Sequence, residues 1–301
     1  MDLNHGLNTA GVSFEQRKGN KPKIVLTESD WKMMQIVNEF RLATVPQITR
    51  LLKHNEQTIY TYRRMHALWL NGYFERFKVY AGSIAGMPNY YVLGKEGVAV
   101  LRGSSEYDSV IVKGHSRSRK IINWQSFQHN CMLTEIASTE ALINDSSLSV
   151  MFRGELGSVE LDESNNRVKL ISPDFTSLYQ TKNTEFILYT EFERSYKEND
   201  YKVKKLNTYK KYLGEDTYGV FIRFIFPTET MELGFWVHTL KNHTKLLKSL
   251  PILSTNLEML TNPQSFKENI YLKIDPSVLF VKKLGNGFKV DPKSFSRVSI
   301  I

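Results

Sequence analysis

The sequence predicts an α+β protein of two domains, and three observations support this prediction. The chain has 301 residues, 41% of them hydrophobic, which suffices for two cores at roughly 100–200 residues per domain. Residues 27–103 carry three helical patterns followed by two strand patterns. Residues 123–301 alternate helical and strand patterns, which is typical of an α/β domain with a mixed sheet.

The start and the middle of the chain lack these patterns. Residues 1–26 are polar and are expected to form a flexible segment. Residues 104–122 mix Ser and Gly with the basic residues Arg117, Arg119 and Lys120, so they are expected to form a basic linker. These cations either follow a phosphate backbone or belong to a solvated tether. The second domain, 123–301, ends in an extension from residue 240 that is expected to complete the sheet or to mediate self-association.

Composition limits the compartment and the chemistry. No run approaches the ~18 apolar residues that a membrane span needs, and the polar N-terminus has no signal-peptide pattern. We therefore expect a cytoplasmic protein without a membrane partner. Cys131 is the only cysteine, which excludes an intrachain disulfide and a zinc site built from several thiolates.

Positive charge is concentrated in the front part of the chain. The formal net charge is +9; residues 1–120 hold 18 lysines and arginines against 10 acidic residues, whereas residues 121–301 hold 22 against 21. A nucleic-acid backbone is the commonest reason for such a bias, because each cation placed on a phosphate releases a counterion. A basic surface that serves only solubility is the alternative.

Three helices are predicted within residues 27–103. Thr27 is expected to cap the first, whose apolar face consists of Trp31, Met34, Val37 and Phe40. Thr44, with Gln47 three positions on, predicts the start of a short second helix. The third helix is expected from about Gln57 to Leu70, where Asn71 and Gly72 signal its end.

Two strand patterns follow, at residues 77–80 and 90–93, with Gly and Pro in the loop between them and a short helix expected near Lys95. Three helices followed by a strand hairpin indicate a winged helix-turn-helix over residues 27–103. The segments RRMHALWLNGYFER and YYVLGKEGVAVLRG resemble those of many bacterial winged-helix domains. The predicted partner is double-stranded DNA, with the third helix in the major groove. Winged helices that bind proteins are the alternative, which the basic charge disfavours.

The helical period predicts which side chains of the third helix face the DNA. With Ile59, Met65 and Leu68 facing inward, the outward side chains are Gln57, Thr58, Thr61 and Arg64. Arg64 is the candidate reader of guanine and Gln57 that of adenine. The candidate phosphate contacts are Lys53, Tyr60, Arg63 and, in the hairpin, Lys78. For each residue the alternative is a solvated polar side chain on an amphipathic helix.

The second domain is expected to begin with a helix over residues 124–144. Strands are predicted at residues 148–152, 186–192, 218–226 and 232–238, with a strongly basic helix, DYKVKKLNTYKKYL, between the second and third. A further helix is expected at residues 242–250, followed by short apolar runs at 270–274 and 277–281.

Three acids in this domain are candidates for chemistry. Asp174 lies in the segment SPDF, and Glu191 and Glu193 lie at the end of the second strand. Two carboxylates, one from each of two adjacent strands, form the oxygen-rich arrangement that binds Mg²⁺ and activates water for attack on a phosphodiester.

This spacing resembles the PD-(D/E)XK nuclease pattern over about residues 124–237. The resemblance implies a lysine two residues after the second acid, but that position is Glu193 here. Lys204 or Lys205 on the next helix is the candidate substitute, as migrated lysines are in some relatives. The alternative is an inert remnant of the fold, whose acids pair with Lys204, Lys205 or Arg194.

The complete order of features, from the winged helix through PDF and YTEFERS to KVKKLNTYKKY, resembles the replication-relaxation family of plasmids and phages over about residues 28–226. The favoured hypothesis is a sequence-specific DNA-binding protein that acts in replication or transcription and needs no cofactor. A homodimer and replication or transcription proteins are its further expected partners. The second hypothesis is a Mg²⁺-dependent nickase with catalytic Asp174, Glu191, Glu193 and Lys205, of which Asp174 and Glu191 hold the metal.

Overall fold

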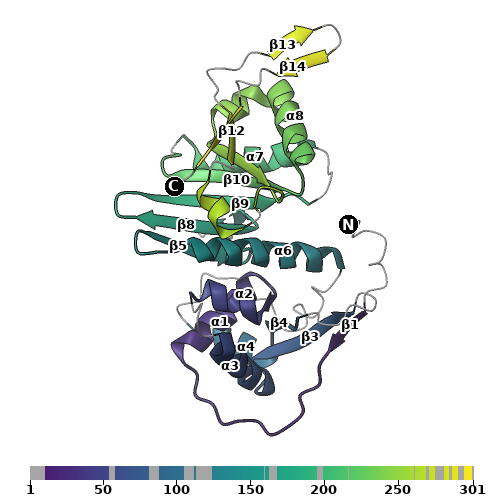
Figure 1. Ribbon diagram of the computed structural model, residues 1–301, viewed down its shortest axis with the longest axis vertical. Coiled ribbons are helices and arrows are strands. Elements are labelled where there is room, and N and C mark those ends of the chain that lie inside the picture. Colours follow the sequence, from purple (N-terminus) through teal and green to yellow (C-terminus); the bar gives the residue numbers. More distant parts are fainter. Residues whose placement is uncertain are drawn as a thin grey trace. The chain divides into compact units, whose positions relative to one another are not determined.

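The computed structural model is a mixed α+β protein, as the sequence predicts (Figure 1). It describes residues 11–53, 58–80, 88–104, 112, 124–158, 160–162, 168–194, 199–215, 217–260, 262–268, 271–274, 281–284, 287–290 and 295–299. The chain divides into two compact units. Unit 1 comprises residues 1–142 and 153–157, and unit 2 comprises residues 143–152 and 158–301.

The helices of unit 1 begin at the predicted caps. α1 spans Glu28–Glu39 behind Thr27, and α2 spans Val45–Leu51 behind Thr44. Each threonine forms a capping box with the residue three positions on, which satisfies two backbone N–H groups at the helix start. α3 spans Thr58–Leu70, and α4 spans Lys95–Arg102. A shared buried core includes Met33, Met34, Val37, Ile48, Met65, Leu68 and Leu101.

A four-stranded sheet completes this part of unit 1, in the order β1-β3-β4-β2. Its strands are β1 (Gly11–Phe14), β2 (Ala43–Thr44), β3 (Phe74–Tyr80) and β4 (Tyr90–Leu93). Within residues 1–26, which were expected to form a flexible segment, residues 11–14 instead form β1 and pair antiparallel with β3. Arg17 adds to this attachment, since its guanidinium donates to the carbonyl oxygens of Trp69 and Phe74 and pairs with Glu75 at 2.7 Å.

α6, Trp124–Glu140, clusters with unit 1, although the predicted domain boundary assigned it to the second domain. The Glu135 carboxylate accepts hydrogen bonds from Gln47 at 2.8 Å and from Arg50 at 2.8 and 3.0 Å. The hydroxyl of Thr134 donates to the carbonyl oxygen of Leu42. These bonds reach α2 and the segment before it, so tertiary contacts rather than chain order decide where this helix belongs.

Unit 2 is built on a seven-stranded mixed sheet in the order β15-β12-β11-β10-β9-β8-β5. Its strands are β5 (Leu148–Gly154), β8 (Phe175–Thr181), β9 (Glu185–Phe192), β10 (Val220–Phe226), β11 (Ile252–Asn256), β12 (Tyr271–Ile274) and β15 (Phe295–Val298). β9, β10 and β11 run parallel, whereas β8 and β12 are antiparallel to their neighbours β9 and β11. The C-terminal extension thus completes the sheet, which was one of its two expected roles.

The described residues also form two separate two-stranded sheets and two 3-10 helices. β6 (Glu160–Asp162) pairs with β7 (Val168–Ile171), and β13 (Val281–Leu284) pairs with β14 (Gly287–Val290). The 3-10 helices η2 and η3 span Ala141–Ile143 and Pro263–Lys267.

Two helices of unit 2, α7 (Asn199–Leu213) and α8 (Glu229–Lys248), cover the same face of the sheet. Side chains alternate along a strand, and Ile222, Phe224 and Phe226 of β10 share one buried cluster with Leu206 of α7 and Phe235 of α8. None of the helices that the structure describes is long and apolar enough to cross a membrane.

The predicted strand at residues 232–238 is wrong, because these residues belong to α8. Thr228 caps the helix, and the residues buried along it have the spacing of a helix: Glu232, Phe235, Trp236, Thr239 and Leu240. The buried Glu232 carboxylate accepts hydrogen bonds from Ser254 and Asn256 of β11. The helix predicted at residues 242–250 is the second half of the same element, and the run at 277–281 lies almost entirely outside the described residues.

Candidate functional site

The exposed face of α3 differs from the predicted one. Thr61, which was expected to face outward, is fully buried, whereas Ile59, which was expected to face inward, is 71% exposed. The buried residues of α3 are Thr61, Met65, Leu68, Trp69 and Leu70. The exposed face follows the i, i+3, i+4, i+7 spacing of one helical stripe and consists of Ile59, Tyr62, Arg63 and His66, with Tyr60 beside it at 49% exposure. We call these five residues the α3 face.

Arg64 does not point outward as predicted, because it forms an ion pair with Asp30 of α1. Its Nε and one terminal nitrogen donate to the two carboxylate oxygens at 2.7 and 2.6 Å, and the same terminal nitrogen donates to the Val25 carbonyl oxygen. The Asp30 side chain is fully buried. Burial alone would raise its pKa, but hydrogen bonds from Arg64 and Thr27 keep the pKa of Asp30 below its ordinary value.

The other predicted DNA contacts have varied positions. Arg63 is exposed within the α3 face, and Lys53 is exposed just after α2. Lys78 is half-buried in β3, with its Nζ 3.8 Å from a carboxylate oxygen of Glu15. Thr58 is half-buried at the start of α3. Four of the candidates lie outside the described residues: Gln57, Arg117, Arg119 and Lys120.

In unit 2 the structure brings the four predicted catalytic residues together. β8 and β9 pair antiparallel with Phe175 opposite Thr190, so Asp174 lies beside the end of β9. The Asp174 N–H donates to the Thr190 carbonyl oxygen, and its carboxylate accepts the Phe192 N–H at 2.7 Å. These two bonds fix Asp174 next to the strand that carries Glu191.

The side-chain alternation of β9 explains why both glutamates meet α7. Tyr189 packs with α7 residues in the buried cluster of the sheet face. Glu191 and Glu193 follow it at two-residue steps and therefore face the same helix. The Lys205 Nζ donates to Glu191 at 2.6 Å and to Glu193 at 3.1 Å, and the Tyr209 hydroxyl donates to the other oxygen of Glu191 at 2.8 Å. We call these five residues, Asp174 included, the acid–lysine cluster.

Burial and neighbouring charges shift the pKa values of the side chains in the acid–lysine cluster. Burial, together with the nearby Asp174, raises the pKa of Glu191 to about 7, although Lys205 and Tyr209 act in the opposite direction. The carboxylates of Glu191, Asp174 and Glu193 raise the pKa of Lys205 and outweigh the burial that would lower it. The raised pKa keeps Lys205 protonated near neutral pH, whereas the pKa of Glu191 itself lies near neutral pH.

The chemistry of this cluster depends on its donor set. Carboxylate oxygens from two neighbouring strands are the ligands that Mg²⁺ prefers, so Asp174 and Glu191 fit the ion that the nuclease pattern implies. Of the two candidate lysines, Lys205 reaches the acids, whereas Lys204 is exposed on α7. Tyr209 was missed from the sequence; its position four residues after Lys205 on a helix was the available signal, because such residues share a face.

Most of the sequence matches the model of one protein family. The sequence matches the family described as replication-relaxation over residues 34–223. This range includes the α3 face and the acid–lysine cluster, and it ends within β10. A comparison with curated proteins found no match.

Proposed function

Since the chain belongs to the replication-relaxation family, we propose that it binds double-stranded DNA during replication through a winged helix in unit 1. The family description indicates a function in replication, and the surface that we propose for DNA lies in unit 1. The observation that carries the proposal is the α3 face, an exposed helical stripe that follows the short helix α2 and precedes the antiparallel strands β3 and β4.

The composition of the α3 face supports a DNA partner. A helix in the major groove contacts thymine methyl groups with apolar side chains and phosphates with cations. Ile59 supplies an apolar side chain at 71% exposure, and Arg63 supplies an exposed cation four residues further along the same stripe. The excess of positive charge in residues 1–120 supports the same partner. Arg64 has no part in this proposal, because its guanidinium is held by Asp30.

Replacing Arg63 by alanine is expected to weaken DNA binding about equally for all sequences. One lost phosphate contact should reduce the slope of log Kd against log salt by about one. The measurement is fluorescence anisotropy with DNA from the protein's own replicon at several salt concentrations. Lys211→Ala, which removes an exposed cation from α7, is the matched control and should leave the slope unchanged. Equal slopes for wild type and Arg63→Ala would refute the DNA role of the α3 face.

A second candidate function, Mg²⁺-dependent cleavage of DNA, is favoured by one observation. Lys205 reaches Glu191 and Glu193 from α7, and therefore supplies the lysine that the chain lacks at position 193. Asp174 and Glu191 would hold the metal, and the bound metal would activate water for attack on the phosphodiester. An ammonium group beside them can stabilise negative charge that develops on the phosphate.

Nicking of supercoiled replicon DNA in the presence of Mg²⁺ tests this candidate. We expect the wild type to produce open circles and Asp174→Asn to lose at least about 100-fold in rate, because the metal loses a charged ligand. The asparagine can still accept the Phe192 N–H, so the fold is preserved. Lys204→Ala is the control and should retain the activity. Binding of the same plasmid by the wild type without any nicking would reject cleavage and leave the DNA-binding proposal standing.

A further inference from the structure

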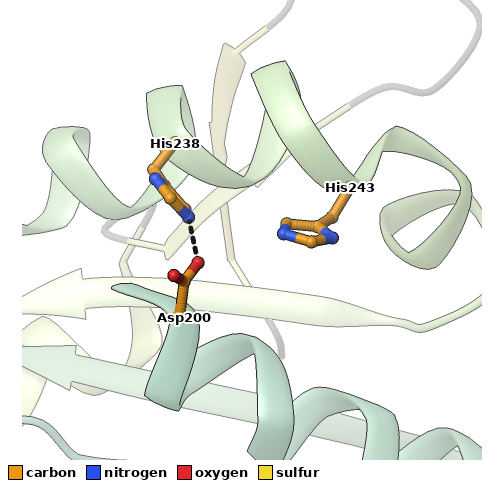
Figure 2. A group of neighbouring side chains, drawn as sticks. All are labelled: Asp200, His238 and His243. Carbon is orange, nitrogen blue, oxygen red and sulfur yellow. Dashed lines mark hydrogen bonds and ion pairs between the residues drawn. The ribbon is translucent and has the colours of Figure 1, made fainter. Parts of the chain in front are cut away.

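A second cluster of ligand-type side chains lies in unit 2, apart from the residues used above. Asp200 at the start of α7 and two histidines of α8, His238 and His243, each offer a ligand atom, and these three atoms lie within 4.8 Å of one another. Figure 2 shows the carboxylate and both imidazoles turned into the same space between the two helices. Both histidines lie beyond the residues matched by the family. We propose that this His₂Asp cluster binds a divalent transition-metal ion of the zinc type.

The backbone of α8 makes this convergence possible. In an undistorted α-helix, residues five positions apart lie about 140° apart around the axis, so His238 and His243 would face different directions. His243 has φ −140° and ψ 35°, which is outside the helical range and interrupts α8 at this residue. The interruption turns the second imidazole toward the first, and their ring centroids are 6.0 Å apart.

Distances within the cluster are close to those of a metal site. Tetrahedral zinc with bonds of about 2.0–2.1 Å brings its ligand atoms to about 3.3 Å from one another. His238 Nε2 and the Asp200 carboxylate oxygen are already 3.1 Å apart. His243 needs only a small side-chain rotation, because all three atoms lie within 4.8 Å. All three side chains are at least partly accessible to solvent, so an ion can reach them.

The donor types select the ion. Two imidazole nitrogens and one carboxylate oxygen suit zinc and its transition-metal neighbours, whereas Mg²⁺ and Ca²⁺ prefer oxygen ligands only. Three protein ligands leave a fourth position for water, as in zinc sites that are open to exogenous ligands. The Asn242 side chain lies 3.4 Å from His238 Nδ1 and can orient this imidazole as an outer partner.

Titration of the metal-free full chain with Zn²⁺, followed by calorimetry and by thermal unfolding, tests the proposal. We expect one ion per chain at this cluster and a rise of about 5 °C in the unfolding temperature at a hundredfold excess over Kd. Co²⁺ should give the strong visible absorption of a tetrahedral site. His238→Ala, His243→Ala and Asp200→Asn should each weaken binding at least about tenfold. Because the Asp200 side chain is 66% exposed, Asp200→Asn is also the variant that should disturb the fold least.

Two matched controls separate this cluster from other metal-binding groups. His66→Ala removes an exposed histidine of α3, and Asp174→Asn changes the acid–lysine cluster; both should retain the wild-type Zn²⁺ affinity and Co²⁺ spectrum. A Zn²⁺ affinity that is the same in the wild type and in all three cluster variants would overturn the proposal. A loss of binding in Asp174→Asn, with the cluster variants unaffected, would also overturn it and would place the ion at the acid–lysine cluster.

Discussion

Replacing Lys205 by methionine is expected to lower the free energy of unfolding by about 3 kcal/mol. The substitution removes the cation that lies 2.6 Å from Glu191 and 3.1 Å from Glu193, and it leaves two buried carboxylates without their positive partner. Urea unfolding at pH 7.5, followed by circular dichroism, measures the change. Lys204→Met, at the exposed neighbouring position, should change the stability by less than about 0.5 kcal/mol.

The loss in Lys205→Met should depend on pH, and its direction follows from Glu191. The folded-state pKa of Glu191 is about 7 in the wild type, above the ordinary value of 4.5. A group with a raised folded pKa contributes stability that is complete below its unfolded pKa and is lost as pH rises through its folded pKa. Removing the nearby cation raises the pKa of Glu191 further. The variant should therefore be closest to the wild type at about pH 5 and weakest above pH 7.

A double variant gives an independent check on this ion pair. Lys205→Met combined with Glu191→Gln removes both a cation and one buried anion, so it should be more stable than Lys205→Met alone. If Lys205→Met were as stable as the wild type at all pH values, Lys205 would not be compensating buried charge in the acid–lysine cluster.

Replacing Arg64 by alanine is the second change with a large expected effect, and it should destabilise the protein by about 3 kcal/mol. Asp30 is fully buried, and Arg64 supplies two hydrogen bonds of 2.7 and 2.6 Å to its carboxylate. Without these bonds, a buried charge is left uncompensated at the start of α1. Arg64→Lys should recover only part of the stability, because an ammonium cannot reproduce the two parallel bonds of a guanidinium. Thermal and urea unfolding measure both variants.

The neighbouring Arg63 provides the matched comparison. Arg63→Ala removes an exposed arginine from the same helix, so it should leave the free energy of unfolding within about 0.5 kcal/mol of the wild type. Under the proposed function, Arg63→Ala weakens DNA binding, whereas Arg64→Ala weakens the fold. An Arg64→Ala protein of wild-type stability that had lost only its sequence preference would return Arg64 to the role of a base reader.

These pairs show how closely structural and functional roles lie along one helix. On α3, one step along the chain separates a fully engaged arginine from an exposed one, because successive residues point about 100° apart around the axis. On α7, Lys204 and Lys205 differ in the same manner. The sequence alone does not tell whether an arginine or lysine forms a buried ion pair or lies exposed at the surface. The residues that surround it in the folded protein decide this.

The sequence by itself determined the features that depend on nearby residues. The caps at Thr27 and Thr44 act within the first turn of α1 and α2, so both helix starts could be predicted. The apolar runs along β9 and β10 and the basic period of α7 likewise predicted their elements. The approach of Asp174 to Glu191 could also be expected, because it needs only two adjacent strands.

Only the tertiary structure decided which face of each element is buried and which charges meet. Thr61 is buried and Ile59 is exposed because of the way α3 packs in its unit, a choice that the helical period alone does not make. The segment at residues 232–238 has an apolar pattern that fits a strand, but the partners of Glu232 on β11 stabilise it as a helix. The pairings of Arg64 with Asp30 and of Lys205 with Glu191 join residues that are 34 and 14 positions apart. Such pairs gain their strength from shared burial, which local sequence does not specify.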